Sequence, residues 1–164
     1  MDVFKRDELY RLTDRVALPG INPEEVPVTR EWVRRYGARF DELRFNVRVG
    51  TGIRLQGAYD DVFIENWYQR TRLKPDLIAW IAPRFATIVE AKVQWLNDAV
   101  WQTLHYRDLY LEEFPEHQVE LVGVCQAYTP QAALLASSSG IRLHVFGFDR
   151  TLPAAAATTE TTPT

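Results

Sequence analysis

Three charged residues interrupt two apolar runs near the middle of the chain, and their types and spacing could support metal chemistry. Asp76 opens the run DLIAWIA, and Glu90 and Lys92 lie within the run FATIVEAKV. Pro83-Arg84 separates the runs, a pattern that predicts an antiparallel β-hairpin. Opposite residues in that hairpin have numbers that sum to about 166 to 168, so Asp76 is expected across from residues 90 to 92. Because side chains alternate along a strand, Glu90 and Lys92 should project from the same face.

Two carboxylates held together on an apolar sheet would raise each other's pKa, and a divalent cation would remove that repulsion. Mg²⁺ usually takes one or two carboxylates together with waters and phosphate oxygens. Such a cation can acidify a bound water and stabilise charge on a phosphodiester. Lys92 could hold the attacking water, neutralise developing charge or, if its pKa is lowered, act as a base. The alternative is that all three are surface charges at strand ends, because a Glu-x-Lys triplet is common by chance.

A second group of polar residues follows the hairpin in the segment QTLHY. We predict a helix capped by Asn97 or Asp98 and ending near Phe114, ahead of a proline. Gln102 and Tyr106 are four residues apart and so share one face of that helix. A helix that follows a strand packs back over the sheet, where the glutamine could reach Lys92 or the attacking water. The alternative is an ordinary helix face with a half-buried tyrosine.

The remaining patterns predict an α/β fold with a mixed sheet flanked by helices. Thr29 is a candidate N-cap for REWVRRYGARF, and LRFNVRV (residues 43–49) alternates as a half-buried strand. Residues 56–72 read as a loop with one strand at VFI. After the QTLHY helix we expect a buried strand at VELVGVCQAY, a helix at TPQAALLASSSG and a last strand at IRLHVFGF. Cys125 is expected to be a buried thiol.

The chain as a whole reads as one folded unit with two extensions. We assign residues 1–28 to an N-terminal arm with a short helix over residues 4–15, residues 29–150 to the folded domain, and residues 151–164 to a disordered tail. With no long apolar run, no apolar leader and a single cysteine, the chain is expected to be cytoplasmic and not to associate with a membrane.

Charge is distributed unevenly along the sequence. The net charge is −3, yet residues 30–92 hold 12 basic and 8 acidic residues. A basic central third could form a groove that attracts phosphate. The candidate phosphate contacts are Arg44, Arg48, Arg70, Arg72 and Lys74. Of the tryptophans near the motif, Trp67 or Trp95 could stack on an unpaired base.

These motifs together resemble a known group of enzymes. Pro75-Asp76 followed by Glu90-Ala91-Lys92, on the order helix, three strands, helix, strand, is similar to the PD-(D/E)xK nuclease superfamily. QTLHY resembles the Gln-x-x-x-Tyr motif of its RecB-like branch. Residues 74–149 resemble the catalytic domain of the NucS/EndoMS mismatch endonucleases. The stretch before the motif leaves no room for the separate DNA-binding domain of those enzymes, so mismatch specificity is not expected.

The resemblance implies a restriction-endonuclease-like core, αβββαβ, with a further helix and strand. It implies a Mg²⁺- or Mn²⁺-dependent deoxyribonuclease that acts on DNA, with the metal held by Asp76, Glu90 and the carbonyl of Ala91. Lys92 would be the catalytic lysine, and the members of the QTLHY segment that would support it are Gln102 and Tyr106.

The resemblance also implies a further acid from the first helix. Glu31 is the first candidate and Glu42 the second, with Asp60 and Asp61 left open. One alternative function is a non-catalytic nucleic-acid-binding or assembly subunit that keeps the fold, and another is an α/β protein with no nucleic-acid partner. A homodimer or a larger assembly stays open, because the sequence shows no coiled-coil seam or obvious apolar patch.

Overall fold

The computed structural model describes residues 3–5 and 18–147. The helix expected over residues 4–15 lies mostly outside this range, and its first two residues belong to a strand instead. The tail from residue 151 also lies outside the described residues.

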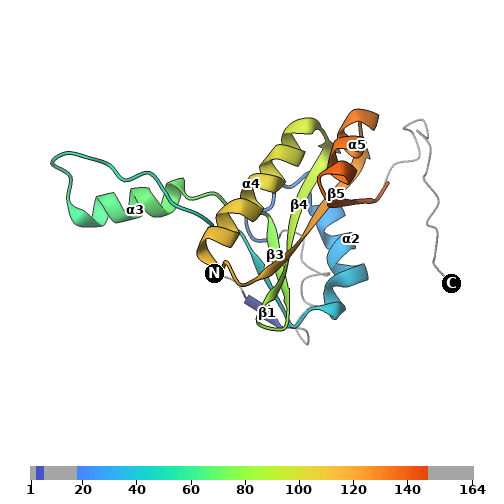
Figure 1. Ribbon diagram of the computed structural model, residues 1–164, viewed down its shortest axis with the longest axis horizontal. Helices are drawn as coiled ribbons and strands as arrows, with labels where there is room; N and C mark the ends of the chain where they lie inside the picture. The colour runs from blue at the N-terminus through green and yellow to red at the C-terminus, as the bar shows by residue number, and fades with distance from the viewer. Residues whose placement is uncertain (1–2, 6–17, 148–164) are drawn as a thin grey trace.

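The described residues form an α/β structure in which strands and helices alternate along most of the chain (Figure 1). The helices are α2 (Val26–Tyr36), α3 (Asp61–Thr71), α4 (Asn97–Glu113) and α5 (Pro130–Ser138), with a 3₁₀ turn, η2 (Gly37–Arg39), after α2. The strands are β1 (Val3–Lys5), β2 (Glu42–Phe45), β3 (Leu77–Ile81), β4 (Phe85–Trp95), β5 (Gln118–Tyr128) and β6 (Ile141–Val145).

The described strands make one mixed sheet in chain order, from the short edge strand β1 to β6. The pairs β1–β2, β2–β3 and β3–β4 are antiparallel, whereas the pairs β4–β5 and β5–β6 are parallel. Each parallel connection passes through a helix, α4 or α5, as a parallel crossover requires. The expected β3–β4 hairpin is confirmed, with Leu77 opposite Val89 and Ile81 opposite Phe85.

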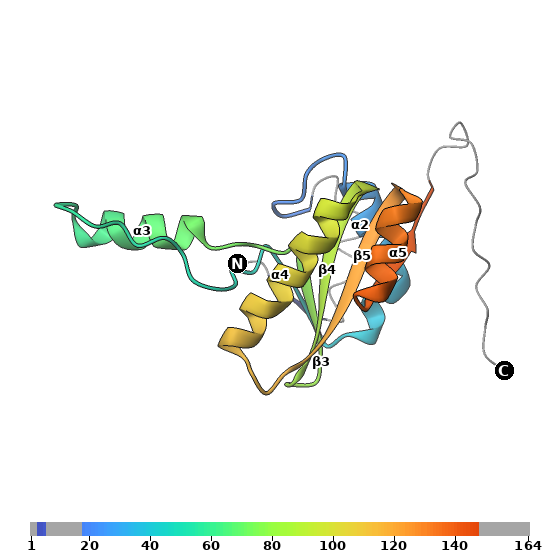
Figure 2. The ribbon, with the colours of Figure 1, turned by 45° about the horizontal axis from the view of Figure 1, so that its top comes forward.

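Helices cover both faces of the sheet, and each face has its own buried cluster (Figure 2). On one face, α2 packs Val28, Trp32 and Val33 over β3, β4 and β5. On the other face, α4 and α5 pack over the opposite side chains of the same strands, including the buried thiol of Cys125. The mixed α/β layer fold predicted from the sequence is therefore present.

The start of the folded part differs from the prediction. Thr29 is not an N-cap: it lies inside α2, where its hydroxyl donates to the carbonyl of Glu25, and Glu25 is the N-cap residue. Leu18 and Ile21 are buried in the same cluster as α2. The expected domain start at residue 29 therefore falls inside a helix, and residues 18–28 pack with the core.

The first long strand is also shorter than predicted. The alternating pattern LRFNVRV suggested a strand over 43–49, but β2 ends at Phe45. Asn46 has a left-handed backbone with φ of 51°, which breaks the extended conformation. Val49 pairs only through an isolated bridge to Leu73.

The largest error concerns residues 56–72, where a loop with one strand was expected. The structure places α3 there, capped by Asp60, whose side chain accepts from the amide of Phe63. No residue of α3 is buried, and Figures 1 and 2 show the helix projecting away from the body. The helix packs no apolar face onto the core, although Asp60 is a typical N-cap residue and Phe63 and Trp67 are at helical spacing.

The C-terminal half follows the predictions closely. Helix α4 ends next to Pro115 as expected, although its N-cap is Leu96 and not Asn97 or Asp98. Strand β5, helix α5 with Thr129 as N-cap, and strand β6 all lie where expected. No described helix is both long and apolar enough to cross a membrane.

Candidate active site

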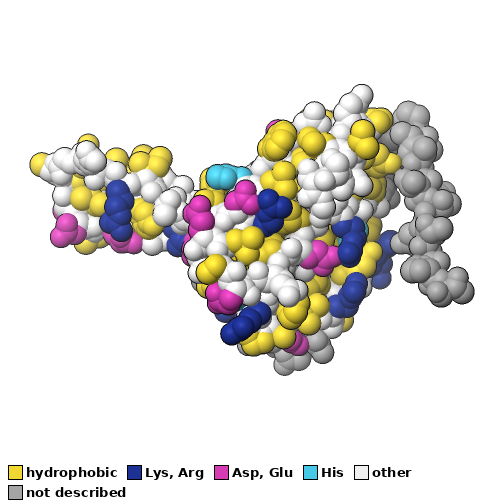
Figure 3. Space-filling view, in the orientation of Figure 1, with side chains coloured by type: hydrophobic (Ala, Val, Ile, Leu, Met, Phe, Trp, Pro, Cys, Tyr) yellow, Lys and Arg dark blue, Asp and Glu magenta, His cyan; other side chains and the backbone are white. Residues whose placement is uncertain are grey.

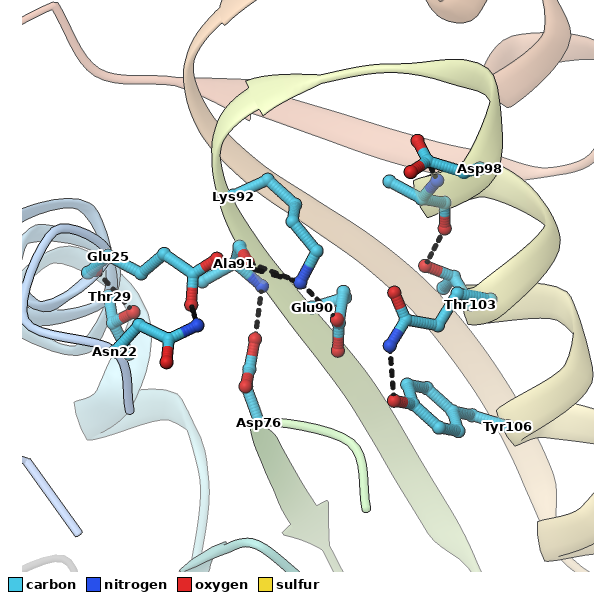
Figure 4. Close-up of polar contacts among 12 residues, drawn as sticks. Asn22, Glu25, Thr29, Asp76, Glu90, Ala91, Lys92, Asp98, Thr103 and Tyr106 are labelled. Atoms are coloured by element: carbon cyan, nitrogen blue, oxygen red, sulfur yellow. Dashed lines mark hydrogen bonds and ion pairs between the residues drawn. The ribbon is translucent and has the colours of Figure 1, made fainter. Parts of the chain in front are cut away.

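The candidate site lies where β4 continues beyond its partner β3. Strand β3 begins at Leu77, whereas β4 runs on to Trp95 with only β5 beside it. The backbone of Ala91 therefore faces an open edge, and side chains replace the missing strand. The Asp76 carboxylate accepts from the Ala91 amide at 2.8 Å, and the Lys92 ammonium donates to the Ala91 carbonyl at 3.0 Å (Figure 4).

Glu90 is the most buried charged residue of this group. It is only 1% exposed, and one carboxylate oxygen, Oε1, accepts from Lys92 at 2.5 Å. The other oxygen, Oε2, is buried without a hydrogen-bond partner among the described residues. A buried carboxylate oxygen with no partner is unfavourable unless another group, such as a cation, satisfies it.

Burial dominates the electrostatics of both acids. Desolvation raises the pKa of Asp76 above its ordinary value, although Lys92 and the amide of Ala91 oppose this shift. Desolvation and then the nearby charge of Asp76 raise the pKa of Glu90. Each acid would therefore ionise more readily with a cation beside it.

Lys92 stays charged in this setting. Burial alone would lower the pKa of its ammonium, but Glu90 and then Asp76 and Glu25 outweigh burial, so that the pKa lies above its ordinary value. The structure thus offers no support for Lys92 as a base and presents it as a fixed cation beside the two acids.

The glutamine and tyrosine of α4 lie on the same side of the sheet as Glu90. Ala86 and Ile88 of β4 face the cluster covered by α4, so strand alternation turns Glu90 and Lys92 to that face as well. The Gln102 amide donates to the Tyr106 hydroxyl at 2.6 Å. Burial and then the charge of Glu90 raise the pKa of Tyr106 to about 12. Tyr106 therefore remains a neutral hydroxyl near the acids, and Gln102 is exposed at the rim.

The structure also brings Glu25 to the site, a residue that sequence reasoning missed. Its carboxylate lies 3.6 Å from the Lys92 ammonium, on the other side of it from Glu90 (Figure 4). Glu25 is 7% exposed and accepts from the side-chain amide of Asn22 at 2.9 Å. The only sequence signal was its place in the proline-flanked stretch before α2, which we took for an arm.

The four acids proposed from the sequence as a further ligand are engaged or placed elsewhere. Glu31 pairs with Arg34 and Arg35 on the surface of α2, which lowers its pKa to about 2. Glu42 pairs with Arg44. Asp60 and Asp61 lie at the start of the projecting helix α3.

Of the candidate nucleic-acid contacts, some are engaged or buried within the fold and one is exposed near the acids. Arg72 donates to the carbonyls of Gly50 and Arg48 and pairs with Glu113, so it supports the backbone there. Trp95 is fully buried and cannot stack on a base. Lys74, exposed next to Pro75-Asp76, is the candidate phosphate contact nearest the acids in the chain.

A divalent cation fits this donor set in its chemistry. No three His, Cys, Asp or Glu side chains in the described part of the chain lie together as a complete cage. Mg²⁺ does not require one, because it is commonly held by one or two carboxylates and keeps several waters. Asp76, Glu90 with its unpartnered oxygen and the carbonyl of Ala91 are such donors, and Glu25 adds negative charge beside them.

Comparisons with known proteins add no family to this description. No family model matches the chain, and neither the curated proteins nor the solved structures compared with it give a significant match.

Proposed function

We propose that the chain is a metal-dependent nuclease that hydrolyses phosphodiester bonds in DNA. The observation that carries the proposal is the buried Glu90 carboxylate, whose Oε2 has no partner among the described residues while Asp76 and Lys92 converge on the same open strand edge. The order α2, β2, β3, β4, α4, β5 supports a restriction-endonuclease-like core, with α3 inserted between β2 and β3. The resemblance of the Pro75-Asp76 and Glu90-Ala91-Lys92 motifs supports DNA as the substrate.

The chain's own residues then have separate roles. Asp76, Glu90 and the carbonyl of Ala91 would hold Mg²⁺ or Mn²⁺, and the bound cation would supply a more acidic water and charge stabilisation at the phosphate. Lys92 presents a fixed positive charge that can donate to a non-bridging phosphate oxygen or to the attacking water. Gln102 can orient that water from α4, and Tyr106 holds the Gln102 amide in place.

Glu25 has a positioning role in this scheme. Its carboxylate lies beside Lys92, opposite Glu90, and so holds the ammonium between two acids. Asn22 and the first turn of α2 fix the position of Glu25 in turn. A residue that acts through Lys92 should affect rate more than DNA binding.

A cleavage assay with purified protein tests the function. Labelled single-stranded, duplex, flapped, mismatched and four-way DNAs would be incubated with Mg²⁺ or Mn²⁺, beside an EDTA control. We expect metal-dependent cleavage of at least one substrate and its loss in Lys92→Ala. Glu120→Gln, which changes an exposed glutamate on β5, is the matched control and should cleave normally.

The outcomes separate the alternative functions. DNA binding without cleavage on every substrate would overturn catalysis and favour the assembly subunit. Neither binding nor cleavage, in a protein that is folded by circular dichroism, would overturn both. Cleavage that survives Lys92→Ala would show that another site, or a contaminant, is responsible.

A further inference from the structure

Helix α3 and the irregular segment before it form a projection with no core of its own. Between Thr51 and Lys74 no residue is buried. Figures 1 and 2 both show this segment standing clear of the body, attached only at its base. We call residues 51–74 the α3 projection.

The base of the projection is well fixed. Arg72 pairs with Glu113 and donates to backbone carbonyls of residues 48 and 50. The amide of Ile53 donates to the Thr71 hydroxyl at 2.7 Å, and the Arg54 guanidinium lies 4.6 Å from the centre of the Tyr68 ring. The segment therefore has a defined direction, and the loop covers the side of α3 that bears Tyr68.

Helix α3 and the residue before its N-cap carry an exposed aromatic row. Tyr59, Phe63 and Trp67 follow one another at four-residue spacing, with stacked rings whose centres are 5.5 Å and 6.4 Å apart. They are 52%, 45% and 40% exposed. The large hydrophobic side chains that are exposed in the projection are Ile53, Tyr59, Val62, Phe63, Trp67 and Leu73. Hydrophobic side chains are spread over the face of the projection seen in Figure 3.

A short helix with no buried residue requires contacts with another surface to be stable. Isolated helices of fewer than about 12 to 15 residues are marginal in water, and α3 spans only Asp61–Thr71. Exposed apolar patches of this kind mark interaction sites on soluble proteins. The aromatic row would gain the burial that it lacks within one chain if a partner packed against it.

The charges on α3 distinguish between a nucleic acid and a second protein helix as the partner. Asp60, Asp61 and Glu65 lie on or at the start of α3, against Arg70 at its end. The projection also holds basic residues at its base: Arg54 lies over the Tyr68 ring, Arg72 pairs with Glu113, and Lys74 ends the segment. The acids are the charges beside Tyr59 and Phe63, and they disfavour a phosphate backbone there. They would attract the basic end of a second, oppositely directed α3 helix.

We propose that the α3 projection is a dimerisation element that pairs with the α3 projection of a second copy of this chain. An antiparallel pair centred on Glu65 places Phe63 opposite the Trp67 position of the other copy and Asp60 opposite its Arg70 position. A two-fold axis makes each of these contacts twice, because the same patch serves both copies. The interface buries the aromatic row, and the acidic start of each helix meets the basic end of the other.

Light scattering after size exclusion, over a range of micromolar concentrations, tests the pairing on the full chain. We expect the wild type to have the mass of two chains and Phe63→Asp to have the mass of one, with the dimer weakened about thirtyfold or more. Leu134→Asp, which changes an exposed leucine on α5, is the matched control and should remain dimeric. Because Phe63 is not buried, circular dichroism of the variant should show the same fold.

The charge of Arg70 tests the register while the Asp60 cap of α3 stays intact. Arg70→Glu should weaken the dimer about tenfold, since it places acid against acid. Arg70→Lys, which keeps the positive charge, should remain dimeric. A wild type that is monomeric throughout would overturn the proposal, as would a dimer insensitive to Phe63→Asp. If the monomer instead bound single-stranded DNA through Phe63 and Trp67, the projection would be a nucleic-acid surface and the proposal would also fail.

Discussion

At the scale of single residues, the candidate site concentrates groups that are unfavourable for folding. Glu90 is almost fully buried next to Asp76, with one oxygen unpartnered in the described structure. Lys92 offsets only part of that cost, because it also faces Glu25 and the carbonyl of Ala91. Buried charge without full pairing usually persists in proteins where function requires it.

Replacing Glu90 with glutamine should therefore stabilise the metal-free protein. Glu90→Gln removes a buried charge and its repulsion from Asp76 while keeping the shape of the side chain. Burial raises the pKa of Glu90, so its ionisation opposes folding at alkaline pH, and Lys92 keeps Asp76 and Glu25 nearby when the charge is removed. We expect the free energy of unfolding to rise by about 1–2 kcal/mol in EDTA, measured by urea denaturation at pH 8. In excess Mn²⁺ the order should reverse, because only the wild type gains stability from the cation. A less stable Glu90→Gln protein in EDTA would argue that Glu90 has a structural role.

The third acid gives a second prediction at this scale. Glu25 lies beside Lys92, whereas Glu31 is held by two arginines on the surface. Glu25→Gln should weaken Mn²⁺ binding about 10-fold by titration calorimetry, as loss of a supporting carboxylate commonly does. Glu31→Gln should bind Mn²⁺ like the wild type. Equal effects of the two substitutions on Mn²⁺ binding would show that Glu25 does not support the metal site.

At the scale of elements, the sequence predicted best those segments whose burial is periodic and whose ends carry turn residues. The β3–β4 hairpin, β5 and β6 are strongly apolar, and Pro83, Pro115 and Gly140 separate them from their neighbours. Helix α3 was missed although Asp60 is an N-cap residue and its aromatic residues recur every four positions; this aromatic row faces solvent and not the core. The alternating pattern after Phe45 wrongly predicted a longer strand. Val49 is buried, but it lies in the segment after β2 and pairs with Leu73 through an isolated bridge.

The same difference between local patterns and packing explains which site residues could be predicted from the sequence. Asp76, Glu90 and Lys92 could be brought together from hairpin register alone, because two adjacent strands fix their spacing. Glu25 could not, because its approach to Lys92 depends on how α2 packs against the end of β4. Contacts between distant elements leave no local pattern in a single sequence.

The contact between β4 and β5 beside the site gives a prediction at the element scale. Gly123 lies opposite Glu90 in the parallel ladder, and Trp95 packs over it. A Cβ at Gly123 would lie 2.5 Å from the Trp95 ring and 2.6 Å from Leu143. Gly123→Ala should lower the free energy of unfolding by about 1–3 kcal/mol in urea denaturation. Gly147→Ala, where a Cβ meets open space, should change it little, and equal stability of the two variants would contradict this packing.

At the scale of the whole molecule, one histidine links the edge strand β6 to the end of α2. His144 of β6 lies with its ring centre 4.6 Å from that of Tyr36, and its Nδ1 is buried without a partner among the described residues. Burial first, and then the positive charges of Arg142, Arg39 and Arg35, lower the pKa of His144 to about 4 from its ordinary 6.5. The folded protein thus keeps this imidazole neutral where the unfolded chain would protonate it.

This difference predicts how global stability responds to acid. Between pH 6.5 and about pH 4 the unfolded chain binds a proton at His144 that the folded protein does not, so stability should fall as the pH falls. In His144→Phe we expect the loss of unfolding free energy between pH 7 and pH 4.5 to be smaller by about 1–2 kcal/mol, since Phe carries no proton in either state. His144→Leu, a second replacement that carries no proton, should show the same reduced slope. If the slope were unchanged in His144→Phe, the docking of β6 on α2 would tolerate a charged imidazole, and the acid sensitivity would have to come from another group.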